Sequence, residues 1–281
     1  MHRIRPLNNL QFTLQSALFM KVSMTSARPL LRTFSVKYKQ VNMNNPRLKA
    51  EVVLSESNRK VCIEKLRSYQ LPSVQETVPE AAVLVPLCMH NGELGLLYTL
   101  RSMKLTTNRG QVSFPGGKRD KEDSDLIETA LRETWEELKI SRDKIDVWTE
   151  GNMIGKTTVN VMPVLAYIGE IVVEDLEINQ DEVEEAFVIS LQKLCDPELF
   201  RFTRFRNINL PTYLGGKHRV WGFTGAITHV VLECLVPNVY KNVFRFYQLR
   251  ETKASDILHA ESQKMKVERK SANQKNTLSK I

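Results

Sequence analysis

Two apolar runs separated by an Asn-Gly pair constrain the fold more than any other part of the sequence. Residues 81–89 are almost continuously apolar, and a second apolar run covers 94–100. Asn91-Gly92 between them is typical of a two-residue hairpin turn, because both residue types tolerate the positive φ angles that such a turn requires. The pattern therefore predicts two central strands joined by a tight turn.

Segments with helical and strand-like periodicity alternate around this hairpin. Residues 55–70 place apolar side chains among charged ones and stop at Leu71-Pro72, which predicts a helix ended by proline. The later pattern predicts an amphipathic helix over 124–138, strands at 147–148 and 161–173, and helical segments over 189–195 and 220–235. No linker or internal repeat interrupts this order, so we expect one α/β domain over 55–245, a mixed α/β sandwich.

Charge, hydropathy and cysteine spacing exclude several classes of protein. The net charge of +8 comes from the two ends of the chain, because residues 51–250 hold more acidic than basic side chains. A nucleic-acid binder spreads basic side chains over a domain face, so nucleic acid is not an expected partner. No apolar run approaches the roughly 18 residues of a membrane span. The four cysteines lack metal-binding or redox spacing, which indicates reduced, buried thiols.

The first 34 residues are typical of a mitochondrial transit segment. Residues 1–50 contain no Asp or Glu, and their basic residues alternate with apolar ones. Arg32-Thr33-Phe34-Ser35 matches a processing pattern in which cleavage follows the aromatic residue, so we expect a mature chain that begins near Ser35 with a flexible lead-in over 35–54. The predicted location is the mitochondrial matrix. A merely disordered basic arm is the alternative.

The other end of the chain is predicted to be a basic, disordered tail over 246–281. Residues 251–281 are rich in Lys, Ser, Asn and Gln and lack the apolar content needed to pack. The chain ends Ser279-Lys280-Ile281, which differs from the S-K-L peroxisomal signal in its last residue. The peroxisome is therefore the alternative location.

The predicted helix over 124–138 carries a group of carboxylates. Glu133, Glu136 and Glu137 lie at helical neighbour spacing, within an arc of about 100° on the helix surface. Like charges so placed destabilise a helix unless a cation lies among them, and an all-oxygen site suits Mg²⁺ or Mn²⁺. Arg132 is four residues from both Glu128 and Glu136 and can brace the group. The alternative is a solvated acidic face.

A pair of glycines precedes this helix. Gly116 and Gly117 belong to the stretch Phe-Pro-Gly-Gly-Lys-Arg-Asp over 114–120. Without a Cβ atom, their backbone can approach an anionic ligand closely. Together with the carboxylates, the pair favours a metal and phosphate site over a solvated face.

Residues Gly117–Ile140 resemble the Nudix box, G-x5-E-x7-R-E-U-x-E-E-x-G-U, where U is aliphatic. The core R-E-x-x-E-E matches in full as Arg132, Glu133, Glu136 and Glu137. The chain departs from the pattern in four ways: one extra residue before Glu133, Asp123 or Asp125 for the early Glu, Thr134 for the first aliphatic residue, and Lys139 for the Gly near the end. A left-handed turn at a non-Gly residue such as Lys139 costs roughly 1 kcal/mol.

The stretch before the box resembles the coenzyme A diphosphatase branch of the Nudix family, whose signature is L-L-T-x-R-(S/A)-x3-R-x3-G-x3-F-P-G-G. The residues in register are Leu97, Thr99, Arg101, Ser102, Gly110 and Phe114–Gly117. Tyr98 stands in place of the second Leu and Thr106 in place of the second Arg, although Lys104 and Arg109 can supply the missing charge. The resemblance extends over roughly 75–237.

This resemblance implies a Nudix fold, an α/β/α sandwich around a mixed β-sheet. It implies metal-dependent hydrolysis of coenzyme A or acyl-coenzyme A to 3′,5′-ADP and (acyl-)4′-phosphopantetheine. Mg²⁺ or Mn²⁺ would be bound by Glu133, Glu137 and Glu136. Glu133, Glu136 and Arg132 would be catalytic, with either Glu133 or an acid of the segment 181–185 as the general base.

The substrate implied by the resemblance is coenzyme A or one of its thioesters, bound by a monomer or a homodimer. The residues expected to bind it surround the glycine pair, namely Arg101, Lys104, Arg109, Gly116, Gly117, Lys118 and Arg119. One alternative is a Nudix diphosphatase for another substrate, such as ADP-ribose, NADH, a nucleoside triphosphate or a capped RNA. Another is a Nudix-fold binding module without catalysis.

Overall fold

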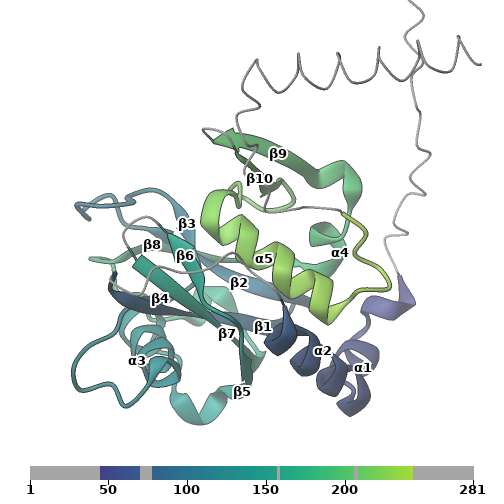
Figure 1. The fold of residues 1–281 in the computed structure, drawn as a ribbon, viewed down its shortest axis with the longest axis horizontal. Helices are drawn as coiled ribbons and strands as arrows, with labels where there is room; N and C mark the ends of the chain where they lie inside the picture. Colours follow the sequence, from purple (N-terminus) through teal and green to yellow (C-terminus); the bar gives the residue numbers. More distant parts are fainter. Residues whose placement is uncertain (1–44, 70–77, 157–158, 206–207, 243–281) are drawn as a thin grey trace, which may run out of the picture. The chain divides into compact units, whose positions relative to one another are not determined.

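Figure 1 shows the computed structural model of the chain, which describes residues 45–69, 78–156, 159–205 and 208–242. All of these residues belong to one compact unit. The predicted transit segment over 1–34 lies outside the described residues, as does Ser279-Lys280-Ile281.

The hairpin predicted around Asn91-Gly92 is at the centre of the fold. Strand β1 (Glu80–His90) pairs antiparallel with β2 (Glu93–Arg101), with Leu87 opposite Leu96. Asn91 has φ 50° and Gly92 has φ 76°, so both take the left-handed conformation that the two-residue turn requires. Both strands are largely buried, as the apolar runs predicted.

The main sheet of the described residues has eight strands and is mixed. Its central order is β3-β2-β1-β7-β5, with β4 on β1, β6 on β7 and β8 on β2. The strands not yet given are β3 (Val112–Ser113), β4 (Gly116–Lys118), β5 (Asp146–Glu150), β6 (Ile154–Lys156), β7 (Val159–Glu170) and β8 (Val183–Ser190). β1 and β7 run parallel, and the other strand pairs of this sheet are antiparallel.

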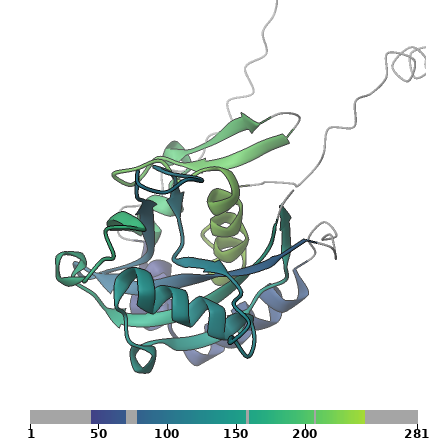
Figure 2. The same cartoon turned by 90° about the vertical axis from the view of Figure 1, so that its left-hand side faces the viewer.

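Helices cover both faces of this sheet (Figures 1 and 2). Helix α3 (Leu126–Leu138) packs on one face through an apolar cluster that includes Leu131 and Leu138. Helices α2 (Glu56–Ser68) and α5 (Gly222–Leu235) pack on the other face through a second cluster. The α/β/α sandwich predicted from the resemblance is therefore confirmed.

Short elements complete the fold. Their bounds are η1 (Pro46–Leu48), α1 (Ala50–Val53), η2 (Arg142–Lys144), η3 (Val173–Asp175), α4 (Leu191–Leu194) and η4 (Pro197–Leu199). A separate two-stranded sheet joins β9 (Phe200–Phe205) to β10 (Ile208–Tyr213).

Two expectations differ from this structure. The lead-in predicted to be flexible over 35–54 is helical in its last part, where Leu48 and Val53 are buried in the core. The helical segment predicted over 189–195 is divided, because its first two residues end β8 and only Leu191–Leu194 is helical. A short apolar run fits either period, and pairing with β2 decided this one.

The cysteines agree with the expectation from their spacing. Cys62, Cys88, Cys195 and Cys234 are buried and free, and burial raises the pKa of each thiol to about 12. Over the part of the chain that the structure describes, no helix has the length and apolar character needed to cross a membrane.

Candidate functional site

Helix α3 presents two carboxylates of the candidate site, Glu133 and Glu137. The Asp125 side chain caps its N-terminus by accepting a hydrogen bond from the backbone N–H of Glu128 at 2.8 Å. At its C-terminus Lys139 adopts the left-handed conformation, with φ 54°, and its N–H donates to the Trp135 carbonyl at 2.9 Å. The turn therefore forms with Lys in the position where the box has Gly, and the last helical turn keeps its geometry.

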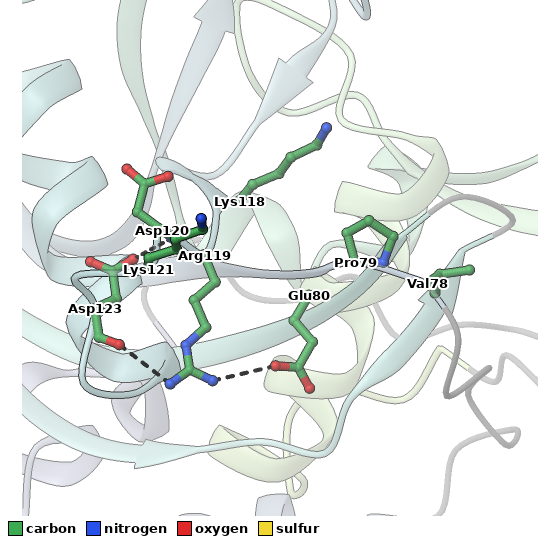
Figure 3. A pocket seen from close by; sticks show the side chains of 8 residues that line it. All are labelled: Val78, Pro79, Glu80, Lys118, Arg119, Asp120, Lys121 and Asp123. Atoms are coloured by element: carbon green, nitrogen blue, oxygen red, sulfur yellow. Dashed lines mark hydrogen bonds and ion pairs between the residues drawn. The ribbon is translucent and has the colours of Figure 1, made fainter.

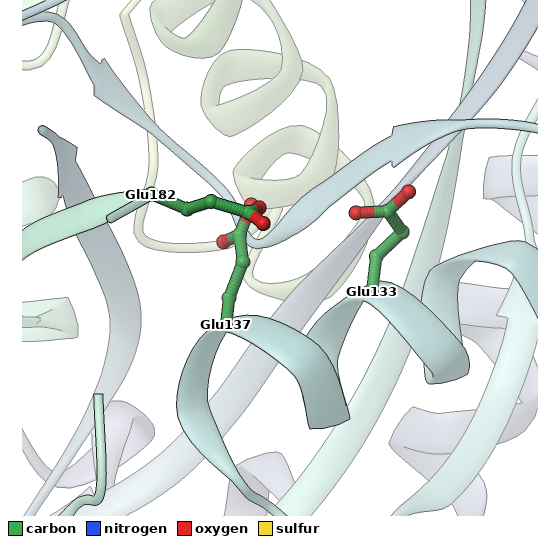
Figure 4. A group of neighbouring side chains, drawn as sticks. All are labelled: Glu133, Glu137 and Glu182. Carbon is green, nitrogen blue, oxygen red and sulfur yellow. The ribbon is translucent and has the colours of Figure 1, made fainter. Parts of the chain in front are cut away.

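Three carboxylates from two separate segments converge at this helix (Figure 4). Glu133 and Glu137 project from α3, and Glu182 reaches them from the turn just before β8. One oxygen from each residue lies within 4.8 Å of the other two. Glu137 is buried, with 2% of its surface exposed, whereas Glu133 and Glu182 are partly exposed. We refer to Glu133, Glu137 and Glu182 as the carboxylate cluster.

The glycine pair is packed against this cluster. A Cβ atom on Gly117 would lie 2.6 Å from Oε2 of Glu133 and closer still to Oε1. Gly116 has φ 151°, and a Cβ there would lie 2.6 Å from the Cα atom of Val83 on the neighbouring strand. The close approach predicted for these glycines is thus made to the Glu133 carboxylate and to β1, because β4 pairs with β1 at this point.

The electrostatics of the carboxylate cluster are those of a cation site. Burial is the main cause that raises the pKa of Glu137 to about 8, and Glu133 and Glu182 raise it further, while Arg101 and the Gly116 backbone oppose the shift. Burial also raises the pKa of Glu133, against the lowering effect of Arg132. Oε2 of Glu137 is buried and has no hydrogen-bond partner among the described residues. An orphaned carboxylate oxygen beside two more carboxylates fits a hard divalent cation, whose charge would offset their repulsion.

Arg132 links this cluster to the loop before the helix. Its guanidinium lies 3.1 Å from Oε1 of Glu133 and donates to Oε2 of Glu136, also at 3.1 Å. On its other side, its Nε donates to Oδ1 of Asp123 at 2.9 Å. The buried Asp123 carboxylate accepts this bond, and the Arg132 guanidinium holds its pKa well below the usual range. Asp123 is therefore the partner of Arg132, whereas Asp125 is the helix cap.

The predicted contact of Arg132 with Glu136 is formed, whereas the predicted places of Glu136 among the clustered carboxylates and of Glu128 beside Arg132 are not. Glu136 is bonded to Arg132, with 44% of its side chain exposed, and is not a member of the carboxylate cluster. Glu128 pairs with Arg142 at 2.8 Å rather than with Arg132. Glu133 and Glu137, the two residues predicted to bind a metal, lie close together, and Glu182 of the 181–185 segment joins them. Nothing in the sequence distinguished Glu182 from the other acidic residues of the 181–185 segment.

Arg101 is the basic substrate-binding candidate whose charge acts on the carboxylate cluster. Its charge lowers the pKa of Glu137, so it lies close to the cluster, and its Nε is buried without a hydrogen-bond partner among the described residues. Lys104 forms an exposed ion pair with Asp181 at 2.8 Å. Arg109 is exposed on the loop between β2 and β3.

Lys118 and Arg119 line a surface pocket of about 520 Å³ (Figure 3). Arg119 spans this pocket, with one nitrogen 3.5 Å from a carboxylate oxygen of Glu80 and another that donates to the Asp123 carbonyl at 3.3 Å. Its guanidinium therefore links the start of β1 to the loop before α3. Lys118 extends away from these contacts. The pocket lies beside Arg132, which donates to the Lys118 carbonyl at 3.1 Å, and does not include the carboxylate cluster.

Comparison with known proteins identifies the family. A model of the NUDIX domain matches residues 78–209. Mitochondrial coenzyme A diphosphatase NUDT8 of Mus musculus is 44% identical over 168 residues, which cover 57% of this chain and 80% of that protein. The chain belongs to the Nudix hydrolase family. Its matched Nudix domain contains the whole carboxylate cluster, and α5 lies outside it.

Two further relatives of this Nudix hydrolase carry related names. The protein named mitochondrial coenzyme A diphosphatase NUDT8 of Homo sapiens is 43% identical over 168 residues, which cover 57% of this chain and 71% of that protein. Peroxisomal coenzyme A diphosphatase NUDT7 of Mus musculus is 36% identical over 120 residues, which cover 42% of this chain and 50% of that protein.

Proposed function

We propose that this Nudix hydrolase cleaves the diphosphate bond of coenzyme A or acyl-coenzyme A in a metal-dependent reaction. The products are 3′,5′-ADP and (acyl-)4′-phosphopantetheine. The observation that carries the metal dependence is the carboxylate cluster, where a buried Glu137 oxygen beside Glu133 and Glu182 has no hydrogen-bond partner within the described part of the chain. The names of relatives at 43% and 44% identity support the substrate.

Glu133, Glu137 and Glu182 would hold the divalent cation, Mg²⁺ or Mn²⁺. When bound, such an ion supplies Lewis acidity to the phosphoryl oxygens and lowers the pKa of a coordinated water. Glu133 and Glu182 are the partly exposed members of the cluster, so water reaches them, and one of these two carboxylates takes the proton of the attacking water. Glu136 supports catalysis indirectly, because its carboxylate accepts a hydrogen bond from Arg132, which in turn lies against Glu133.

Arg101 is the cation best placed to bind the diphosphate. Its charge already acts on Glu137, and its buried Nε, which has no partner in the segments that the structure describes, is a donor for a phosphate oxygen. Lys104, Arg109 and Lys118 stand farther out and supply charge for the 3′-phosphate of the adenosine part. Gly116 and Gly117 serve by packing against β1 and Glu133, which keeps the cluster compact.

We propose the mitochondrial matrix as the compartment, with the transit segment over 1–34 as the signal. The acid-free composition of this segment and the names of the two mitochondrial relatives support this location. Ser279-Lys280-Ile281 makes the peroxisome the competing location. Residues 1–34 fused to a fluorescent protein are expected to direct it to mitochondria, and peroxisomal fluorescence of the full chain that depends on residues 279–281 would contradict the proposal.

The reaction is tested by incubating the purified protein with coenzyme A and Mg²⁺ or Mn²⁺ and separating the products by chromatography. We expect equal release of 3′,5′-ADP and 4′-phosphopantetheine, which chelation of the metal abolishes. Glu137→Gln is expected to lose more than 100-fold in turnover, whereas Glu150→Gln on the exposed end of β5 is the matched control.

A panel of ADP-ribose, NADH, a nucleoside triphosphate and a capped RNA tests the substrate. The coenzyme A assignment is wrong if one of these is cleaved far better than both coenzyme A and acyl-coenzyme A. Thr106, where the signature has its second Arg, is the position that would explain such a result. Binding of coenzyme A without turnover in the presence of either metal would instead indicate a binding module.

A further inference from the structure

The turn over residues 179–183 carries Glu182 into the carboxylate cluster. The Asn179 carbonyl accepts hydrogen bonds from the N–H groups of Glu182 at 3.0 Å and Val183 at 2.8 Å. Asn179 thus begins the turn, and Val183 begins β8 directly after it. The hydrogen bonds that hold this turn therefore determine where the Glu182 backbone lies.

Two neighbouring elements hold the turn. The N–H of Asn179 donates to the Glu137 carbonyl at 2.9 Å, which ties the turn to the last turn of α3. On the other side, the N–H of Ser102 donates to the Glu182 carbonyl at 2.9 Å, and its Oγ donates to the Gln180 carbonyl at 3.2 Å. The Glu137 backbone is therefore hydrogen-bonded to the turn that carries Glu182.

The Asn179 side chain makes two contacts inside the turn. Its Oδ1 accepts from the N–H of Asp181 at 3.2 Å, two residues on, which is the contact of an Asx turn. Its Nδ2 donates to Oε1 of Glu182 at 3.4 Å. An amide is suited to both contacts, because it offers an acceptor for the backbone and a neutral donor for the carboxylate. Asp at this position would keep the acceptor but would place a second negative charge beside Glu182.

We propose that Asn179 is a positioning residue of the active site. Its side chain shapes the turn and directs the Glu182 carboxylate toward Glu133 and Glu137. This inference rests on the proposed function, since it assumes that the carboxylate cluster binds the metal. Residues that orient metal ligands typically change metal affinity by 10- to 100-fold when they are replaced.

The test is a titration of the protein with Mn²⁺ alone, in which the signal of free Mn²⁺ in electron paramagnetic resonance measures the bound fraction. Asn179→Ala and Asn179→Ser are each expected to weaken Mn²⁺ binding by about 10-fold. Ser keeps a hydroxyl acceptor for the Asp181 N–H and so preserves the turn, but it is too short to reach Glu182. The Ser variant is therefore expected to melt at the wild-type temperature.

Asn152→Ala is the matched control. The Asn152 side chain also makes two hydrogen bonds, to the carbonyls of Arg67 at 3.1 Å and Tyr69 at 2.7 Å, away from the carboxylate cluster. This variant is expected to bind Mn²⁺ as the wild type does. With coenzyme A as substrate, the Asn179 variants are expected to lower kcat and leave KM within about two-fold. A general loss of folded protein would also lower the apparent kcat at unchanged KM, so the wild-type melting temperature expected of Asn179→Ser is what separates the two.

Glu182→Gln separates failure of this inference from failure of the metal site. Weaker Mn²⁺ binding in Glu182→Gln together with wild-type binding in Asn179→Ser would overturn the role of Asn179 and leave the metal site standing. Wild-type binding in both variants would remove Glu182 from the metal site and the positioning role with it.

Discussion

Replacing Asp123 by Asn is expected to destabilise the protein by about 3 kcal/mol. The Asp123 side chain is 2% exposed. Its Oδ1 accepts from the Nε of Arg132 at 2.9 Å, and its Oδ2 accepts from Arg132 Nη2 at 3.1 Å, from Thr129 Oγ1 at 2.8 Å and from the backbone N–H of Asp120 at 2.9 Å. An amide in this place would put an NH₂ group against hydrogen-bond donors and remove the charge that faces Arg132.

The magnitude follows from this burial. Removing one partner of a buried ion pair costs about 3–5 kcal/mol. The lower end applies here, because Arg132 keeps its contacts with Glu133 and Glu136. With a urea m-value of about 3 kcal/mol/M for a domain of this size, the midpoint of unfolding is expected to fall by about 1 M.

Urea unfolding at pH 7, followed by tryptophan fluorescence, measures this shift. Asp120→Asn is the matched control, because Asp120 is 62% exposed and lies 3.7 Å from the same guanidinium. Its loss should stay below about 0.5 kcal/mol. A loss of less than 1 kcal/mol in Asp123→Asn, or one no larger than that of the control, would refute the argument that the buried pair stabilises the loop before α3.

The same pair gives a pH dependence with a definite sign. The folded-state pKa of Asp123 is lowered, so its stabilising effect is fully present above the unfolded-state pKa of about 3.9 and is lost as the pH falls toward the folded-state pKa. The difference in unfolding free energy between the wild type and Asp123→Asn is therefore expected to be constant between about pH 5 and 8 and to shrink below about pH 4. A difference that grows on acidification would contradict this assignment.

Three further predictions concern the backbone and the cations of the site. Gly117→Ala is expected to weaken Mn²⁺ binding by about 10-fold, because the new Cβ displaces the Glu133 carboxylate. Gly169→Ala is the control: the space around it is open, so it should lower the free energy of unfolding by about 1 kcal/mol through its positive φ and leave Mn²⁺ binding unchanged. Lys139→Gly relieves the left-handed residue at the end of α3 and should raise the free energy of unfolding by about 0.5 kcal/mol in urea denaturation; a decrease would mean that the residue is not strained. Arg101→Ala should lower kcat/KM for coenzyme A by about 100-fold, and the exposed Arg109→Ala by less than about 3-fold; equal losses would contradict the special place of Arg101.

Local patterns were enough to predict the elements that carry their own periodicity. The hairpin around Asn91-Gly92 follows from two apolar runs and a dipeptide suited to positive φ. The helix over 124–138 follows from its 3.6-residue period, and it forms as Leu126–Leu138. Strands β9 and β10 were not predicted, since short segments of mixed polarity acquire their strand conformation only by pairing with each other.

The candidate site likewise has a part that was predictable from the sequence and a part that only the fold decided. The sequence by itself determined that Glu133 and Glu137 share a helix face, because residues four apart on a helix are neighbours. Only the tertiary structure decided the third carboxylate: Glu136 points to Arg132, and Glu182 arrives on a turn that is bonded to the Glu137 carbonyl. The physical reason is that these oxygens come from separate segments, and their convergence depends on sheet pairing and backbone hydrogen bonds between residues far apart in the chain.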